Sequence, residues 1–92
     1  MDAVTKSAEE RLLEEGYEDV LIFKNYSYDD ALIGVTEDNR AVYDYDKMIE
    51  WVMKLEGFTV EEAVDWLDFN IISFLPRYDT KGPIIVHTLR TT

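Results

Sequence analysis

Hydrophobic side chains recur at helical spacing in the middle of the chain. This stripe consists of Met48, Ile49, Val52 and Leu55, with Trp51 at its edge. Asp44 or Asp46 is suited to cap the first turn, and Gly57 is a natural stop. The pattern therefore predicts a helix over about 45–56.

A second helical stripe follows after a connection of about two residues. Its inward positions are Ala63, Val64, Leu67 and Ile71. Thr59 and Glu62 have the spacing of a capping box, in which each side chain satisfies a free backbone N–H of the first turn. We predict a helix from Val60 to Asn70 or to Leu75, which Pro76 ends in either case. Because the connection is so short, the two helices form an αα-hairpin.

Short β-branched and aromatic runs predict four strands. They are Val20–Phe23, Ala31–Thr36, Ala41–Tyr43 and Ile84–Thr88. The second and third form a hairpin, because Asp38 and Asn39 between them suit a turn with positive φ. Gly34 marks a bulge or a close packing point. The segments 25–30 and 77–82 are expected to be loops.

The chain begins with a short predicted helix, for which Ser7 and Glu10 form a capping box and Gly16 provides the stop. The element order is therefore α-β-β-β-α-α-β. The simplest arrangement that buries these stripes is an α+β fold, with a small, mainly antiparallel sheet packed by the αα-hairpin. The length of 92 residues fits one domain, 1–92.

Composition narrows the class of protein. The chain is 47% hydrophobic, which is too apolar for a disordered protein, and it has no cysteine for a disulfide or a thiolate metal site. Its first sixteen residues are acidic, unlike a signal peptide, and its longest apolar runs are far shorter than a membrane span. We expect a soluble, cytoplasmic protein.

The net charge is −11 at pH 7, and it is unevenly distributed. Residues 1–68 hold 19 of the 20 acidic side chains, whereas residues 69–92 hold one acid and three bases. Such a surface repels nucleic acid and anionic membranes, whose recognition requires lysine and arginine. The expected partner is therefore a basic protein, with no direct binding of nucleic acid and no membrane.

Acidic side chains form a regular row on the second predicted helix. Glu61, Asp65 and Asp68 lie at i, i+4 and i+7, so they share one outward face at steps of about 5–6 Å. This spacing is close to that of successive phosphates, and no lysine or arginine interrupts the segment 59–76. The row is either a phosphate-mimicking surface or an ordinary solvated face. Further candidates for partner contacts are Asp29, Asp30, Glu37 and Asp38.

Catalytic and metal-binding patterns are absent from the sequence. The single histidine, His87, lies in a predicted apolar strand, where a hydrogen-bonded structural role is expected. Paired carboxylates such as Asp44 and Asp46 have structural roles as helix caps, and the four glycines form no phosphate-binding loop. We predict no enzymatic activity, no cofactor and no metal.

Several segments of the chain are distinctive in sequence: 28–35, 40–50 (RAVYDYDKMIE) and 61–70 (EEAVDWLDFN), together with Leu75-Pro76 and Pro83-Ile84-Ile85. In these segments the chain resembles a family of small proteins from Firmicutes and from their phages and mobile elements. The resemblance covers roughly residues 28–86. Small acidic proteins in this context are often inhibitors of host defence, including anti-CRISPR proteins, some of which place acidic surfaces in a DNA-binding channel. The resemblance implies no catalytic residues.

Two functional hypotheses follow. The first is a non-enzymatic, anti-CRISPR-like inhibitor or DNA mimic that binds a CRISPR nuclease or another nucleic-acid-binding defence protein. The alternative is a regulatory protein–protein interaction domain that binds through an apolar and tyrosine surface, to which five tyrosines could contribute: Tyr26, Tyr28, Tyr43, Tyr45 and Tyr78. The protein is expected to be a monomer, or a homodimer that pairs through its final strand.

Overall fold

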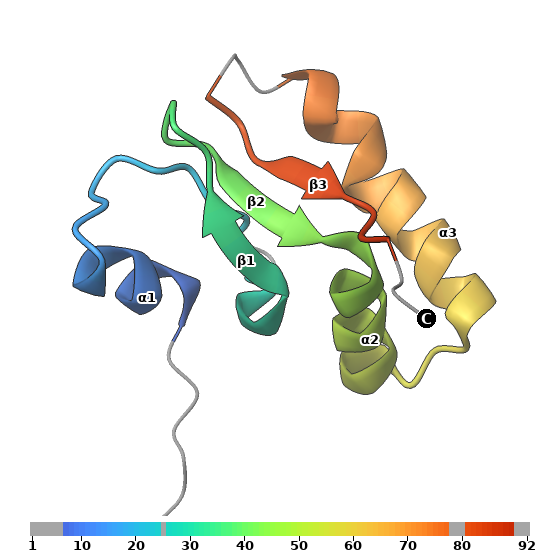
Figure 1. Ribbon diagram of the computed structural model, residues 1–92. Helices are drawn as coiled ribbons and strands as arrows, with labels where there is room; N and C mark the ends of the chain where they lie inside the picture. Colours follow the sequence, from blue (N-terminus) through green and yellow to red (C-terminus); the bar gives the residue numbers. More distant parts are fainter. Residues whose placement is uncertain (1–6, 25, 78–80, 90–92) are drawn as a thin grey trace, which may run out of the picture.

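A computed structural model describes residues 7–24, 26–77 and 81–89 of the chain (Figure 1). The elements are α1 (Ala8–Glu14), η1 (Asp29–Ala31), β1 (Leu32–Val35), β2 (Ala41–Asp44), α2 (Tyr45–Glu56), α3 (Val60–Asn70), η2 (Ile72–Arg77) and β3 (Ile84–Val86), where η denotes a 3₁₀ helix. The predicted α+β class is confirmed, with a short N-terminal helix, a small sheet and an αα-hairpin.

The three strands lie in the order β1-β2-β3. β1 and β2 form the predicted antiparallel hairpin, and the register shifts between Leu32, which pairs with Tyr43, and Gly34, which pairs with Val42. The extra residue in this interval is a β-bulge beside Gly34, as the sequence indicated. Asn39 adopts the positive φ of 65° that was expected of the turn.

β3 joins the other side of β2 in a parallel orientation, with Val42 opposite Ile84 and Asp44 opposite Val86. Parallel neighbours require a long crossover connection, and α2 and α3 provide it here. The strand is shorter than predicted, because residues 87 and 88 follow it outside the ladder. In the view of Figure 1, α1 lies beyond β1 and α3 lies along the β3 side.

The predicted helix caps are all present. The Ser7 and Thr59 side chains accept the backbone N–H groups of Glu10 and Glu62 in two capping boxes. Asp44, the last residue of β2, caps α2 by accepting the N–H of Asp46, so strand and helix meet without a loop. Gly57 ends α2 at a φ of 70°. The α-helix α3 ends at Asn70, and the chain continues to residue 77 as the tighter helix η2.

The predicted strand Val20–Phe23 is wrong, because this segment pairs with no other strand. Its backbone is held instead by a side chain: the Phe23 N–H donates to the Tyr43 hydroxyl at 3.3 Å. Phe23 is 3% exposed, and Val20 and Ile22 pack against the core. The β-branched and aromatic composition therefore reflects burial rather than pairing in a sheet.

Aromatic rings dominate the core. The rings of Tyr28 and Tyr43 are fully buried, and the Phe23 ring lies 4.8 Å from Tyr43 and 5.9 Å from Tyr28 between ring centroids. Tyr28 has a left-handed backbone, with φ 50° and ψ 45°, at the start of η1. For a residue with a bulky side chain, this conformation costs about 1–2 kcal/mol. The buried ring contacts hold the residue in this conformation.

Two buried tyrosine hydroxyls differ in their hydrogen bonding. The Tyr43 hydroxyl accepts from Phe23, whereas the buried Tyr28 hydroxyl has no hydrogen-bond partner among the residues that the structure describes. We expect Tyr43→Phe to lower the free energy of unfolding by about 1 kcal/mol, and Tyr28→Phe to leave it unchanged or to raise it by up to about 1 kcal/mol. Urea denaturation of the two variants measures both changes. A larger loss in Tyr28→Phe than in Tyr43→Phe would contradict this assignment.

The ionisation of Tyr28 makes the fold sensitive to alkali. Burial raises the pKa of its hydroxyl above the ordinary value of about 10. The unfolded chain therefore loses this proton at a lower pH than the folded chain, so stability is retained below about pH 10 and falls as the pH rises further. We expect Tyr28→Phe to reduce this alkaline loss, as measured by thermal unfolding between pH 8 and pH 11. An identical pH dependence in variant and wild type would exclude Tyr28 as its source.

Candidate acidic binding surface

Helix α3 presents the row of acidic side chains that the sequence predicted. Ala63 and Leu67 bury the inner face of the helix, and Glu61, Asp65 and Asp68 are all exposed. None of the three carboxylates accepts a hydrogen bond or forms an ion pair within the described part of the chain. The structure therefore places these acids together on one solvated helix face, with their charges unneutralised.

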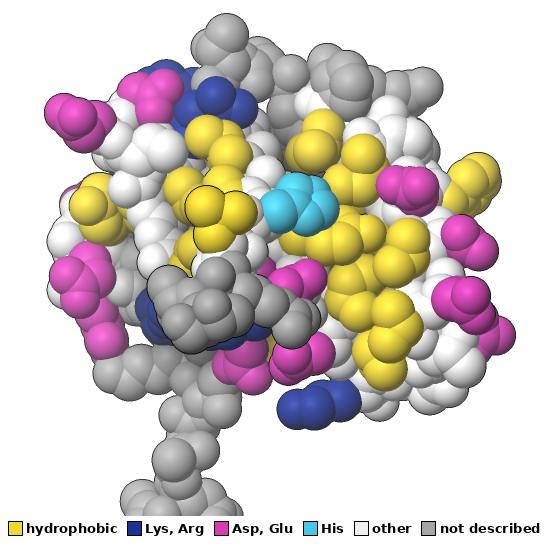
Figure 2. All heavy atoms as spheres, turned by 45° about the vertical axis from the view of Figure 1, so that its right-hand side comes forward, with side chains coloured by type: hydrophobic (Ala, Val, Ile, Leu, Met, Phe, Trp, Pro, Cys, Tyr) yellow, Lys and Arg dark blue, Asp and Glu magenta, His cyan; other side chains and the backbone are white. Residues whose placement is uncertain are grey.

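Hydrophobic side chains border this acidic row. On α3 itself, Phe69 is 76% exposed and Val60 is 55% exposed. Figure 2 shows hydrophobic side chains gathered in the middle of one face, with the single histidine among these hydrophobic side chains and carboxylates mostly around the margin. Protein interfaces commonly combine an apolar centre with a polar rim. The sequence analysis did not predict Phe69 as an interface residue. Its position outside the inward stripe of the helix could have indicated that its ring is exposed.

The acidic row extends toward the beginning of α2. Burial raises the pKa of the Tyr45 hydroxyl, and the negative charges of Asp68 and Asp46 raise it further. Asp46 is exposed, and the sequence assigned it only to capping; it and Asp68 both lie near enough to the Tyr45 hydroxyl to act on its pKa. The chain connection does not reveal this proximity, because α2 and α3 approach each other only in the folded hairpin.

His87 differs from its predicted role. It follows β3 rather than lying within it, and its exposed ring contacts Tyr45 at 4.5 Å between centroids. The expected place of His87 within the strand is therefore wrong, and no hydrogen bond to its imidazole occurs among the described residues. The contact places the histidine on the same side of the molecule as the acids that surround Tyr45.

Asp29 has a structural role in docking α1. Its carboxylate accepts the Ala8 N–H at 2.7 Å, and its backbone carbonyl accepts from the Arg11 guanidinium at 2.7 Å. These two bonds join the first helix to η1 across about twenty residues of chain. The neighbouring Asp30 is exposed and faces α2 across a pocket. The two adjacent acids thus have different surroundings.

Glu37 and Asp38 lie at the exposed tip of the β1–β2 turn. The Thr36 hydroxyl donates to the Asp38 carboxylate, and this bond, assisted by nearby Arg40 and Lys81, lowers the pKa of Asp38. The Lys81 ammonium also donates to the Asp38 carbonyl at 3.0 Å. These contacts give the turn a mixed charge, so it is a weaker candidate for an acidic interface than α3.

The predicted interface tyrosines serve mainly as packing residues. Tyr28 and Tyr43 are fully buried, and Tyr78 lies outside the described residues. The Tyr26 ring stacks on Trp66 of α3 at 5.3 Å, and its hydroxyl donates to Glu56 of α2. Tyr26 therefore ties the preceding loop to both helices of the hairpin. Of the five predicted interface tyrosines, two are therefore too deeply buried to contact a partner.

The described part of the chain contains neither a cluster of metal-binding side chains nor a membrane-spanning helix. Within residues 7–24, 26–77 and 81–89, no three acidic, histidine or cysteine side chains are grouped so that they could hold a metal ion. Over the same residues, no helix has the length and apolar character needed to span a bilayer.

The chain matches no model of a known protein family, and comparisons with curated proteins and with solved structures find no significant match. The resemblance to the family from Firmicutes and phages therefore stays a prediction.

The different roles of Asp29 and Asp30 can be tested by parallel substitutions. We expect Asp29→Ala to lower the free energy of unfolding by about 1–2 kcal/mol, because it leaves the Ala8 N–H without its acceptor and loosens α1. Asp30→Ala serves as the control and changes stability by less than about 0.5 kcal/mol. Urea denaturation gives both values. Equal effects at the two positions would contradict the docking role.

Proposed function

We propose that this protein is a non-enzymatic inhibitor that binds a nucleic-acid-binding protein of host defence, with a CRISPR nuclease as the expected class of target. The observation that carries the proposal is the α3 face, where Glu61, Asp65 and Asp68 are exposed and have no ion-pair partner among the described residues. A groove that normally binds phosphates offers lysine and arginine side chains at comparable intervals. The row would occupy such a groove in place of nucleic acid, as a DNA mimic does.

The overall charge supports association with a basic target. A net charge of −11 on 92 residues creates a long-range field that speeds encounter with a positive surface. The same field opposes direct binding to nucleic acid. The charges of Asp46 and Asp68 both raise the pKa of Tyr45. Asp46 would therefore enlarge the contact at the Asp68 end of the row.

The alternative is a regulatory interaction domain whose affinity comes from apolar contacts. The exposed Phe69 ring is the specific observation that favours it, because an aromatic side chain that is 76% exposed is a strong candidate for an interface anchor. The two hypotheses share a surface but differ in the source of affinity. Charge reversal and salt test the first, and Phe69→Ala tests the second.

We expect the triple variant Glu61→Lys, Asp65→Lys, Asp68→Lys to lose target affinity by about 100-fold or more, because each introduced lysine repels the basic groove. The fold should persist, since all three side chains are exposed. A matched control carries Glu15→Lys, Glu18→Lys and Asp19→Lys, which makes the same change in net charge at exposed positions outside α3. Circular dichroism checks the fold of both variants.

The measurement is capture of the target by the tagged full-length protein from a Firmicute lysate rich in CRISPR effectors, with a salt gradient and identification by mass spectrometry. The proposal requires a basic nucleic-acid-binding protein that duplex DNA displaces and that about 0.5 M salt releases, where the Debye length is roughly 4 Å. It also requires the α3 variant to fail and the control to bind. A target held through 0.5 M salt that is lost only in Phe69→Ala would support the alternative.

A further inference from the structure

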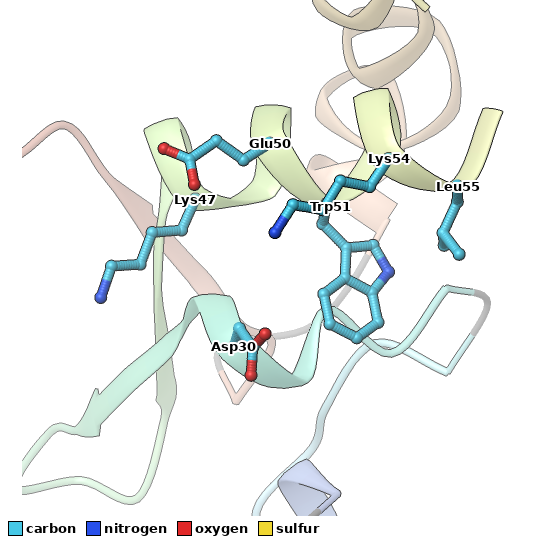
Figure 3. A pocket seen from close by; sticks show the side chains of 6 residues that line it. All are labelled: Asp30, Lys47, Glu50, Trp51, Lys54 and Leu55. Atoms are coloured by element: carbon cyan, nitrogen blue, oxygen red, sulfur yellow. The ribbon is translucent and has the colours of Figure 1, made fainter. Parts of the chain in front are cut away.

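A second surface feature lies between α2 and η1, and none of its residues belongs to α3. It is a pocket of about 280 Å³. The residues that line it are Asp30, Lys47, Glu50, Trp51, Lys54 and Leu55 (Figure 3). All but Asp30 lie on one side of α2, and Asp30 faces them from η1. Pockets for drug-sized ligands begin at about 300 Å³. The volume of this pocket is just below that limit, so it suits a small molecule.

The walls of this pocket are fixed by the core. Trp51 packs toward the buried ring of Tyr28, with 6.4 Å between ring centroids. Met48 and Val52, on the inner side of α2, are fully buried, and so is Ala31 at the end of η1. The distance between α2 and η1 is therefore set by core packing, and the pocket is largely formed before any ligand arrives.

The charges in the pocket are balanced but unpaired. Two lysines and two acids line it, in a protein whose net charge is −11. Glu50 and Lys54 are four residues apart on α2, a spacing that favours an ion pair, yet none of the four charged side chains forms an ion pair or a hydrogen bond in the described structure. Opposite charges thus face the same space without neutralising each other.

The arrangement of these groups indicates what would neutralise them. Figure 3 shows the Asp30 carboxylate on the η1 side of the space, the Lys54 ammonium on the α2 side and the Trp51 ring beside them. Lys47 and Glu50 also line the pocket, but in Figure 3 their charged ends extend away from Asp30 and Trp51. An anion would therefore meet the Asp30 carboxylate, and a cation would meet the Lys54 ammonium. A molecule that carries both charges satisfies both sides.

We propose that this pocket binds a free α-amino acid with an aromatic side chain. The ligand's carboxylate would accept from Lys54, and its ammonium group would donate to Asp30. Its ring would lie against Trp51 and Leu55, the latter 54% exposed in the free protein. Because such a ligand is neutral overall, the large negative charge of the protein does not oppose its binding. None of the residues that line the pocket belongs to α3.

L-Phenylalanine is the first probe, and we expect a dissociation constant of about 0.1–1 mM for a ligand of its size. Titration is followed by calorimetry and by the ¹H–¹⁵N signals of the full-length protein, with the Trp51 indole signal assigned through Trp51→Phe. We expect the shifts to concentrate in α2 and η1. Phenethylamine lacks the carboxylate and 3-phenylpropanoate lacks the ammonium group, and each should bind at least about tenfold more weakly.

Substitutions distinguish the roles of the two charges. Lys54→Gln should weaken L-phenylalanine at least about fivefold and leave phenethylamine unaffected. Asp30→Asn should weaken L-phenylalanine and leave 3-phenylpropanoate unchanged or strengthened. Lys24→Gln removes the same charge at an exposed site outside this pocket and should change nothing.

Three results would overturn the proposal: no shifts with 10 mM L-phenylalanine, equal affinity for 3-phenylpropanoate, or equal loss in Lys24→Gln and Lys54→Gln. The triple α3 charge-reversal variant should bind L-phenylalanine with wild-type affinity. Failure of the α3 proposal would therefore leave this one standing, and failure of the pocket would leave the α3 proposal standing.

Discussion

The left-handed turn at Tyr28 is the constraint on which the rest of the structure depends. With its φ at 50°, the chain reverses locally, the ring enters the core and η1 begins at the next residue. Asp29 then reaches the N-terminus of α1, Asp30 faces α2, and Leu32 starts the sheet. A local strain of about 1–2 kcal/mol is offset by burial of a whole aromatic ring, which contributes more than that. The docking of α1, the pocket and the start of β1 are thus set by a single backbone conformation.

The two proposed sites use the αα-hairpin differently. α3 buries Ala63 and Leu67 and leaves its outer side free for carboxylates, so the acidic row requires nothing from the rest of the chain beyond a stable helix. The pocket, by contrast, depends on contacts between distant segments, because the packing of Tyr28 against Trp51 must hold α2 and η1 at a fixed distance. One surface follows from local periodicity, and the other follows from tertiary packing.

This difference explains how much the sequence could predict. The helix 45–56, both capping boxes, the hairpin turn at Asn39 and the exposure of Glu61, Asp65 and Asp68 follow from local rules, and the structure confirms them. The prediction for Val20–Phe23 was wrong because an apolar segment of this kind fits a strand and a buried loop equally well. Its backbone is held by the Tyr43 hydroxyl, a contact that only the folded structure reveals. The burial of Tyr28, the docking role of Asp29 and the pocket beside Trp51 depend on contacts between distant segments, which no local pattern encodes.

The parallel pairing of β3 has a consequence for folding during synthesis. Val42 and its partner Ile84 are 42 residues apart, whereas the β1–β2 hairpin and the helix hairpin are closed by short turns. The local units can form while the chain is still leaving the ribosome, but β2 keeps this edge open until residues 84–86 emerge. During that interval the edge is available to any extended segment, including that of another nascent copy. Pairing of β3 therefore protects β2, and a chain cut short before residue 84 would leave this edge of β2 unpaired.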